Sequence, residues 1–423
     1  MRLIPSAALL AAFTMVAGLA QAQTVLSITL DGNAETIAAM DALTAAYTAA
    51  HPDVTFEIES RPGGADGDNL VKTRLATGEA GDILQYNSGS LFQALRPVEQ
   101  LADLTAIAGQ ANVIDSFKSV VTASDGTVRG VPFGPAMGGG IYYNKKIYAE
   151  LGLSVPKSWA EFMANNEKIK AAGKVAVAQT YGDTWTSQLF VLADFYNVQA
   201  AEPNFAADYT ANKAKYGTSP SAMAGFQYLE DTFKAGYLNE DFGVAKFDDG
   251  VRMVATGEAA HYPMLTFAIG NVQQNFPDNV KDVGFFAQPG PDAAKNGLTV
   301  WMPSGVYVAQ TSEHQAEAKD FLKFLASPEG CQIAIAAAGA TGPYLIKGCD
   351  LPADVPQSVA DMLPYFAAGM TAPALEFLSP IKGPNLEQLT VEVGSGIRPA
   401  AEAAALYDQD VEKQAQQLGL PNW

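Results

Sequence analysis

Residues 130–172 carry the clearest structural signal in the chain, and they read GVPFGPAMGGGIYYNKKIYAELGLSVPKSWAEFMANNEKIKAA. Two apolar runs flank the segment PAMGGG at 135–140, which predicts two strands joined by a glycine-rich crossover between lobes. Asn144 has the position of an N-cap for a short helix that Gly152 ends. Ser158 and Glu161 have the capping-box spacing for a longer helix over residues 159–172. The segment therefore predicts an α/β protein that changes from one part to another at this point.

Upstream, apolar runs and helical spacing alternate from residue 25 to residue 86. We expect strands at 25–30, 54–58 and 82–86, with helices at 34–50 and 69–76 between them. This βαβαβ order predicts a mostly parallel sheet with helices on both faces. Ligands of such sheets bind beyond the carboxyl ends of the strands, which here fall at 31–35, 61–68 and 85–89.

The first 22 residues have the features of a secretory signal peptide. Arg2 precedes an apolar run from Ala7 to Ala20, and Ala20-Gln21-Ala22 forms an A-x-A cleavage site, so the mature chain should begin at Gln23. The apolar run is 14 residues long, too short to span a bilayer. We expect a soluble protein exported to the periplasm.

The composition predicts a large folded protein that avoids polyanions. Of 423 residues, 48% are hydrophobic and 17% are charged, which allows sizeable cores in two or three domains. The formal net charge is −19, so nucleic acid and anionic membranes are unfavourable partners. Cys331 and Cys349 are expected to form a disulfide in an oxidising compartment, with two buried free thiols as the alternative.

Signatures of catalysis are few. The three His residues stand far apart in the sequence, and HExxH, CxxC, G-x-S-x-G and P-loop patterns are all missing. We therefore nominate no catalytic residue, metal ligand or cofactor. A pair of carboxylates acting as a glycosidase stays open, because two acids can meet from anywhere among 45.

Several polar and aromatic residues occupy positions suited to a ligand site. Trp185 and Trp301 stand in polar, turn-rich contexts, and an aromatic face can stack on a sugar ring. The polar residues at the predicted strand ends are Asn33, Glu35, Gln85 and Asn87. Helix capping is the alternative role for Asn33. The glycines at 138–140 either permit a tight crossover or let the backbone approach a ligand.

The mature chain resembles the extracellular solute-binding proteins of ABC-type sugar importers. The resemblance rests on six segments in the family's order: AYTAAHPDVTFEIE, LVKTRLATGEAGDILQ, LADLT, VRGVPFGPAMGGGIYYNKKIYAELGLSVPKSWAEF, MVATGEAAHYPMLTFAIG and AEAKDFLKFLASPEG. It implies two α/β lobes, each with a mostly parallel sheet, joined by a hinge around a ligand. The implied lobes are residues 23–133 plus 301–346 and residues 134–300 plus 347–423.

The resemblance also implies which residues bind the ligand. Carried over onto this sequence, these are Asn33, Glu35, Gln85, Asn87, Gly138, Gly139, Trp185, Thr266, Phe267 and Trp301. The chain departs from the family's pattern in having LDGNAET at the first strand end, His261 where Met is usual, and Phe267 in place of Trp. These departures concern the identity of the sugar rather than the fold.

The function implied is capture of a neutral carbohydrate, either a mono- or oligosaccharide, or of a polyol, and its delivery to the membrane permease subunits of an ABC importer. We expect a monomer without enzymatic activity. The scarcity of cations near the first strand ends, where Arg61 and Lys72 stand, agrees with an uncharged ligand. The alternatives are a binder of an amino acid, iron or a phosphodiester on the same fold, a sensor accessory protein, or a secreted glycoside hydrolase.

Overall fold

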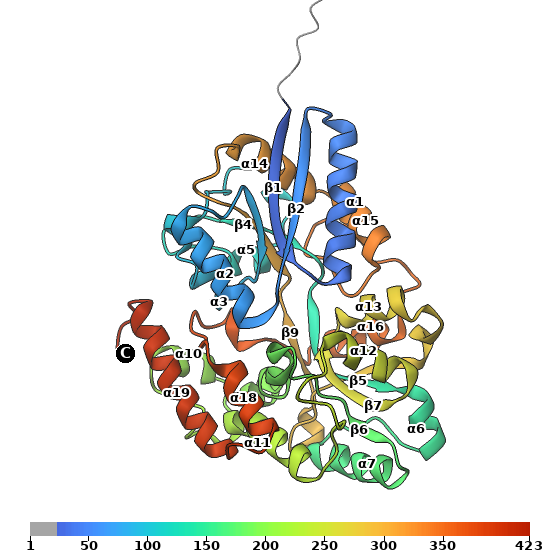
Figure 1. Cartoon of the computed structure of the whole chain (residues 1–423). Helices are drawn as coiled ribbons and strands as arrows, with labels where there is room; N and C mark the ends of the chain where they lie inside the picture. The colour runs from blue at the N-terminus through green and yellow to red at the C-terminus, as the bar shows by residue number, and fades with distance from the viewer. Residues whose placement is uncertain (1–22) are drawn as a thin grey trace, which may run out of the picture.

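Two β-sheets, each covered by helices, organise the residues that this computed structural model describes, 23–423. Figure 1 shows them as two lobes, an upper one in blue and orange and a lower one in green, yellow and red. The expected signal peptide lies outside the described residues.

The first lobe is built on a five-stranded sheet with the order β2-β1-β3-β10-β4. β1 pairs in parallel with β2 and β3, whereas β10 is antiparallel to both β3 and β4. Its elements are β1 (Thr24–Asp31), α1 (Ala34–Ala50), β2 (Val54–Arg61), α2 (Gly64–Thr77), β3 (Ile83–Tyr86), α3 (Ser90–Gln93), α4 (Pro97–Gln100), η1 (Ala108–Ala111), α5 (Asp115–Val120), β4 (Gly130–Phe133), β10 (Ser304–Val308), α14 (Gln315–Leu325) and α15 (Pro328–Ala338).

The second lobe is built on a six-stranded sheet with the order β11-β9-β5-β7-β6, in which β8 also pairs with β5. Its elements up to β9 are β5 (Met137–Asn144), α6 (Lys145–Leu151), α7 (Trp159–Ala171), β6 (Val175–Val177), η2 (Thr184–Gln188), α8 (Leu189–Leu192), α9 (Phe195–Ala201), α10 (Phe205–Thr210), α11 (Pro220–Lys234), α12 (Phe247–Thr256), β7 (Ala259–Leu265), α13 (Ala268–Asn275), η3 (Pro277–Asp282), β8 (Val283–Ala287), η4 (Ala293–Lys295) and β9 (Leu298–Trp301). The chain returns to it with α16 (Gln357–Ala360), α17 (Leu363–Ala367), β11 (Thr371–Pro373), η5 (Leu375–Phe377), α18 (Leu386–Gly394) and α19 (Ala400–Gln417).

Each sheet has one strand that runs against the others, and the chain path explains why. β5 is antiparallel to β7, β8 and β9, as β10 is to its neighbours in the first sheet. Both strands follow directly on a strand of the other lobe, β4 before β5 and β9 before β10. A chain that passes straight between lobes enters the second sheet running the opposite way. All strands but one in each sheet therefore point the same way, as predicted, but the reversed strand makes both sheets mixed, with four parallel and five antiparallel pairings.

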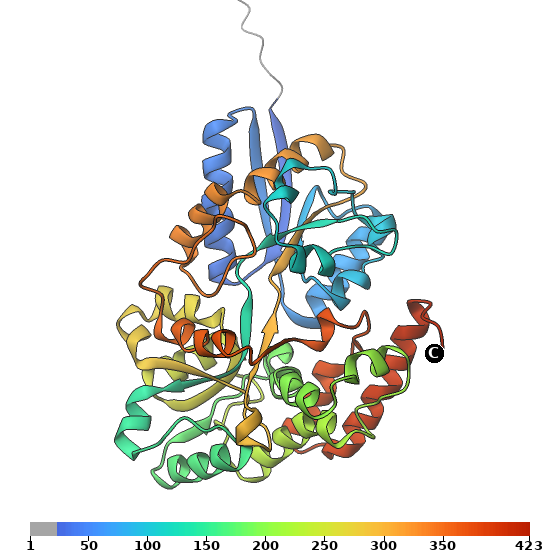
Figure 2. The same cartoon turned by 180° about the vertical axis from the view of Figure 1, so that it is seen from behind.

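The crossings between the lobes lie side by side. The amide of Ala136, between β4 and β5, donates to the carbonyl of Pro343 at 2.7 Å, and Pro135 bridges Tyr344. The hydroxyl of Ser88 donates to the carbonyl of Pro303, between β9 and β10, at 2.8 Å. Figure 2 shows the orange chain after α15 passing from the upper lobe to α16 in the lower one.

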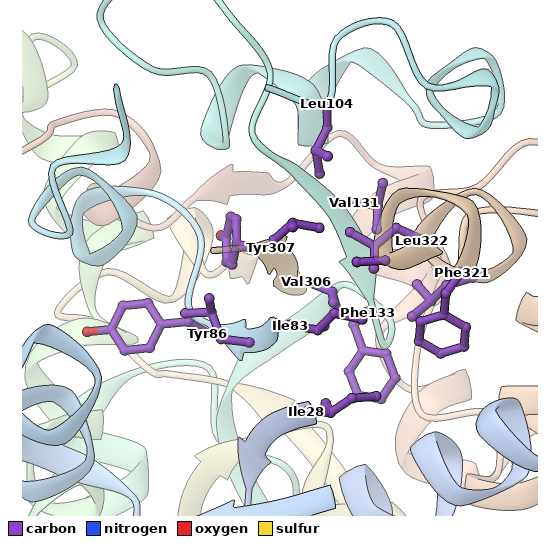
Figure 3. Close-up of a cluster of buried hydrophobic side chains, with 14 of the residues drawn as sticks. Ile28, Ile83, Tyr86, Leu104, Val131, Phe133, Val306, Tyr307, Phe321 and Leu322 are labelled. Atoms are coloured by element: carbon purple, nitrogen blue, oxygen red, sulfur yellow. The ribbon is translucent and has the colours of Figure 1, made fainter. Parts of the chain in front are cut away.

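Separate hydrophobic cores divide the chain between the lobes. The first core uses side chains from Leu26 to Phe133 and from Val306 to Ala338, and part of it is shown in Figure 3. Trp301 ends β9 in the second sheet, whereas Cys349 packs beside Cys331 in the first lobe. We therefore propose that the second part of the first lobe begins just after Trp301, rather than at it, and ends just after Cys349, rather than at residue 346.

The helix caps expected at 130–172 are confirmed, and so is the disulfide, but the crossover is shorter than expected, because residues 138–140 lie inside β5 (Met137–Asn144). Asn144 caps α6, and Ser158 and Glu161 form the capping box of α7. Cys331 and Cys349 are bonded, which links α15 to the chain that leaves the first lobe. Among residues 23–423, the helices include none that combines the length and the apolar character needed to cross a membrane.

One helix begins earlier than its sequence suggested. We expected a loop over 61–68 and a helix from residue 69, but α2 starts at Gly64. Gly63 takes the extended N-cap conformation without a side-chain cap, and Asp66 places a negative charge in the first turn, where the helix dipole favours it.

Candidate ligand-binding site

Three strand-to-helix turns of the first lobe face the second lobe. The start of α1 contacts α13, the start of α2 contacts η2, and the turn before α3 contacts η5. The first amides of a helix lack partners within the helix and point out of its N-terminus, where they can bind polar groups. The contact zone between the lobes is therefore the place where the predicted strand-end residues can meet a ligand.

Glu35 and Asn33 begin the first of these turns and are used differently. Asn33 caps α1, because its Oδ1 accepts the amide of Thr36 at 2.8 Å. The carboxyl of Glu35 is buried, and its Oε1 accepts the hydroxyl of Thr341 at 3.1 Å. Burial raises the pKa of Glu35 to about 8, although the hydrogen bond from Thr341 opposes the shift. A Cβ added to Gly270 would lie 2.8 Å from Oε2, so the carboxyl reaches α13 of the second lobe.

Gln85 holds the end of β1 together with the Asp31–Arg61 ion pair. Its Oε1 accepts the amide of Asp31 at 3.0 Å, and the carboxylate of Asp31 lies 2.9 Å from the guanidinium of Arg61. Burial raises the pKa of Asp31, and the charge of Arg61 opposes that shift. Asn87 is half-buried, and its carbonyl accepts the hydroxyl of Tyr307 at 3.0 Å.

Buried polar atoms without a hydrogen-bond partner gather at the same strand ends. They include Nε of Arg61, the hydroxyl of Ser90 and the hydroxyl of Tyr86, whose pKa is raised by burial and, less strongly, by the nearby carboxyl of Asp68. The Arg61 guanidinium lies 5.3 Å from the centre of the Tyr86 ring. Figure 3 shows this ring extending out of the core, with its hydroxyl on the side away from Phe133 and Val306. Buried polar groups normally have partners, so this cluster has unused capacity to bind a polar ligand.

The second lobe contributes aromatic rings. The ring centre of Trp185, in η2, lies 5.5 Å from that of Phe247 and 6.2 Å from that of Phe267. The rings of Phe247 and Phe267 stack on each other with their centres 5.4 Å apart. A Cβ on Gly63 would lie 3.4 Å from Nε1 of Trp185, so the indole faces the start of α2 across the lobes. Trp185 and Phe267 are thus brought together as predicted site residues, and Phe247 is an addition that the sequence did not single out.

Gly138, Gly139, Thr266 and Trp301 form a second group, where β5 pairs with β7 and with β9. Gly138 and Thr266 exchange hydrogen bonds, since the Gly138 amide donates to Thr266 Oγ1 and the Thr266 amide donates to the Gly138 carbonyl, both at 2.9 Å. A Cβ on Gly139 would lie 2.2 Å from the Trp301 ring. Trp301 is 5% exposed and packs in a small core with Phe377. Here the glycines make room for protein side chains of the second lobe.

Other residues at the lobe contact were missed because they come from the distant C-terminal segment. Glu387 of α18 accepts the hydroxyl of Thr184 at 2.7 Å, and its Oε2 lies 3.0 Å from where a Cβ on Gly64 would stand, at the start of α2. Burial raises the pKa of Glu387 despite this hydrogen bond. Lys382 lies 3.4 Å from Glu376, close to the start of α3. Thr184 and Glu387 are 203 positions apart, and no local pattern in the sequence predicts that they are in contact.

His261, the departure noted from the sequence, belongs to the core of the second lobe. It is fully buried, its Nε2 lies 2.7 Å from the Tyr148 hydroxyl, and burial lowers its pKa to about 3. Among residues 23–423, acids, His and Cys gather in no group of three or more that would suit a metal ion. An open hollow of about 480 Å³ lies away from the lobe contact, over β1 and β2, beside Glu59 and Arg74.

Comparison with known proteins identifies the class. The family model described as "Bacterial extracellular solute-binding protein" matches residues 33–330, and the chain belongs to this family. A curated relative, the multiple sugar-binding protein of Streptococcus mutans, is 25% identical over 308 residues, 70% of this chain and 70% of the relative.

Solved structures agree on the fold. A chitin oligosaccharide binding protein matches with a TM-score of 0.81 and 22% identity, covering 93% of this chain and 99% of its own. The solute-binding protein RafE, solved in complex with raffinose, matches with a TM-score of 0.76 and 20% identity, covering 94% of this chain and 100% of its own. At these identities the likeness establishes the two-lobed fold alone.

Proposed function

We propose that this protein binds a neutral carbohydrate, a mono- or oligosaccharide or a polyol, between its lobes and delivers it to the membrane permease subunits of an ABC importer. The observation that carries the proposal is the pairing of two unlike surfaces across the lobe contact. The first lobe presents buried, unpartnered polar groups at its strand ends. The second presents the rings of Trp185, Phe247 and Phe267. Sugars need both, because their hydroxyls form hydrogen bonds and their C–H faces pack on aromatic rings.

Each predicted site residue has a place in the proposal. Glu35, Gln85 and Asn87, with the free amide group of Asn33, would bind hydroxyl groups from the first lobe. Trp185 and Phe267 would stack on the ring. Gly138, Gly139, Thr266 and Trp301 would fix the backbone from which Phe267 projects, since Thr266 is held by Gly138.

The charges at the cleft favour an uncharged ligand over a phosphodiester. Arg61 pairs with Asp31, and Lys382 pairs with Glu376. A phosphate would have to take one of these cations from its carboxylate partner, at a cost in electrostatic energy. The relative from Streptococcus mutans, whose name is that of a multiple sugar-binding protein, supports the same choice.

A thermal-shift panel tests the ligand class. Purified protein is heated with separate sugars, polyols, amino acids, glycerophosphodiesters and ferric iron. A ligand at 100 times its Kd should stabilise the fold by about 2.7 kcal/mol, a shift of a few degrees. We expect the shift with a carbohydrate or polyol. A shift with another class alone, or release of reducing ends from an oligosaccharide, would contradict the proposal.

Export and oligomeric state belong to the same proposal. We propose a monomer in the periplasm, with residues 1–22 removed as a signal peptide. Mass spectrometry of the chain recovered from the periplasm should give an N-terminus at Gln23, and light scattering should give the mass of one chain. A retained leader, or a dimer at micromolar concentration, would overturn that part.

A further inference from the structure

The carboxyl of Glu35 lies where the two lobes and a crossing segment meet. It projects from the first turn of α1 in the first lobe, accepts the Thr341 hydroxyl of the crossing at 3.1 Å, and reaches Gly270 in the first turn of α13 in the second lobe. Glu35 is 8% exposed and Thr341 is fully buried. Separating α13 from α1 would therefore expose this carboxyl to water.

The segments packed around the carboxyl carry no formal positive charge, and the partial positive N-termini of α1 and α13 favour its ionised form there. α13 reads AIGNVQQN and the crossing at 339–344 reads GATGPY, all uncharged at neutral pH. β5 contributes Tyr142 and the crossing contributes Tyr344, whose pKa values are raised by burial and, less strongly, by the charge of Glu35. In α15 the charged residue is Glu329. It lies in the first turn of that helix, whereas the crossing follows the last residue of the helix, Ala338. An ionised carboxylate buried among such neighbours is costly.

We propose that Glu35 is a proton-linked contact between the lobes, protonated while α1 and α13 are together and ionised when they separate. The neutral carboxyl fills the space beside Gly270 without an unpaired buried charge. Separation lets water hydrate the carboxylate and removes the penalty for ionisation. The closed arrangement thus takes up a proton, whichever solute the protein binds.

The direction of the pH dependence follows from the two protonation states. Burial raises the pKa of Glu35 from 4.5 to about 8 in the closed arrangement, and a hydrated carboxyl returns toward the lower value. Between these pH values the closed arrangement binds more protons than the open one, so raising the pH favours opening. Each pH unit in this interval changes the closed-to-open ratio by up to about tenfold.

Small-angle X-ray scattering of the ligand-free protein between pH 5.5 and pH 9.5 tests the proposal. The wild type should expand as the pH rises, while Glu35→Gln, which keeps the shape and cannot ionise, should stay compact throughout. Glu57→Gln, on the exposed side of β2, changes the charge equally and should behave as the wild type. A wild-type curve that does not change with pH, or a Glu35→Gln variant that expands like the wild type, would overturn it.

A second variant checks the contact from the other lobe. Gly270→Ala places a Cβ 2.8 Å from the position of Oε2, closer than a carbon and an oxygen normally lie, so the carboxyl of Glu35 must move away from α13. Because the end of a glutamate side chain can rotate, this variant should weaken the dependence of the scattering curve on pH, and adding Glu35→Gln should remove what remains. Circular dichroism confirms that each variant is folded. A Gly270→Ala variant that keeps the full pH dependence of the wild type would contradict the assigned contact.

Discussion

The two faces that meet between the lobes are built from different kinds of sequence. The first lobe offers strand ends and helix starts, where Asp31, Arg61 and Gln85 hold one another in place. The second offers rings, Trp185 and Phe267, from segments some 80 residues apart in the chain. The two faces therefore have different tasks. The polar face orients a ligand through directional hydrogen bonds, and the aromatic face supplies much of the binding energy through its buried area. Variants of each face should therefore fail in different ways.

The largest effect is expected in the first lobe from Arg61→Met. This change leaves the carboxyl of Asp31 without its cation, and breaking such a pair typically costs about 3–5 kcal/mol when it is buried. The Arg61 side chain is 3% exposed and that of Asp31 is 25% exposed, so we expect the lower end of that range. Because burial already raises the pKa of Asp31, the loss should be larger at pH 8 than at pH 5, when the carboxyl can accept a proton.

Urea unfolding at the two pH values measures this loss. Arg74→Met is the matched control, because Arg74 also pairs with a carboxylate, Glu59, but at the exposed edge of the same lobe. An exposed pair contributes at most about 1 kcal/mol. Equal losses in the two variants would show that the Asp31–Arg61 pair is no better protected than a surface pair.

The next largest effect is expected from removing the disulfide between Cys331 and Cys349, which lies in the first lobe. Replacing Cys331 and Cys349 together by Ala opens a loop with a sequence separation of 18, which should cost roughly 3 kcal/mol. Calorimetry should show an earlier unfolding transition, and the second lobe should keep its own if the lobes unfold separately. An unchanged melting profile would mean that the link contributes nothing to stability.

The contrast between the faces also explains what the sequence could predict. Strand ends follow from periodicity, so Gln85 and Glu35 were nominated as ligand residues from their position, and the structure places Glu35 at the lobe contact. The roles of Phe247 and Glu387 depend on tertiary contacts across many intervening residues, and no local spacing encodes them. Gly139 was noticed for its backbone freedom, yet its main contact is the Trp301 ring, 162 positions away in the sequence. The capping box of α7 was predictable because its two hydrogen bonds join residues three positions apart, and the strands were predictable because their burial leaves apolar runs in the sequence.

The aromatic face should lose affinity rather than stability when its leading ring is removed. Trp185→Ala deletes a half-buried indole at the lobe contact and should weaken carbohydrate binding by about 2 kcal/mol, roughly thirtyfold. Titration calorimetry with the sugar found by the thermal-shift panel measures this. Phe366→Ala removes a partly exposed ring of α17 and should leave the affinity unchanged. Equal affinities for Trp185→Ala and the wild type would remove this ring from the site.

The smallest effect separates capping from ligand contact. Asn33 and Ser158 both cap helices through a side-chain oxygen, Asn33 at the lobe contact and Ser158 at the start of α7. Asn33→Ala and Ser158→Ala should each cost about 1 kcal/mol of stability, because each leaves a helix amide without its partner. The Oδ1 of Asn33 is occupied by Thr36, but its Nδ2 can still donate to a sugar hydroxyl. Asn33→Ala should therefore also weaken sugar binding by about 1 kcal/mol, roughly fivefold, while Ser158→Ala should not. If both variants lose stability and neither loses affinity, Asn33 is a helix cap only, and the polar face begins at Glu35.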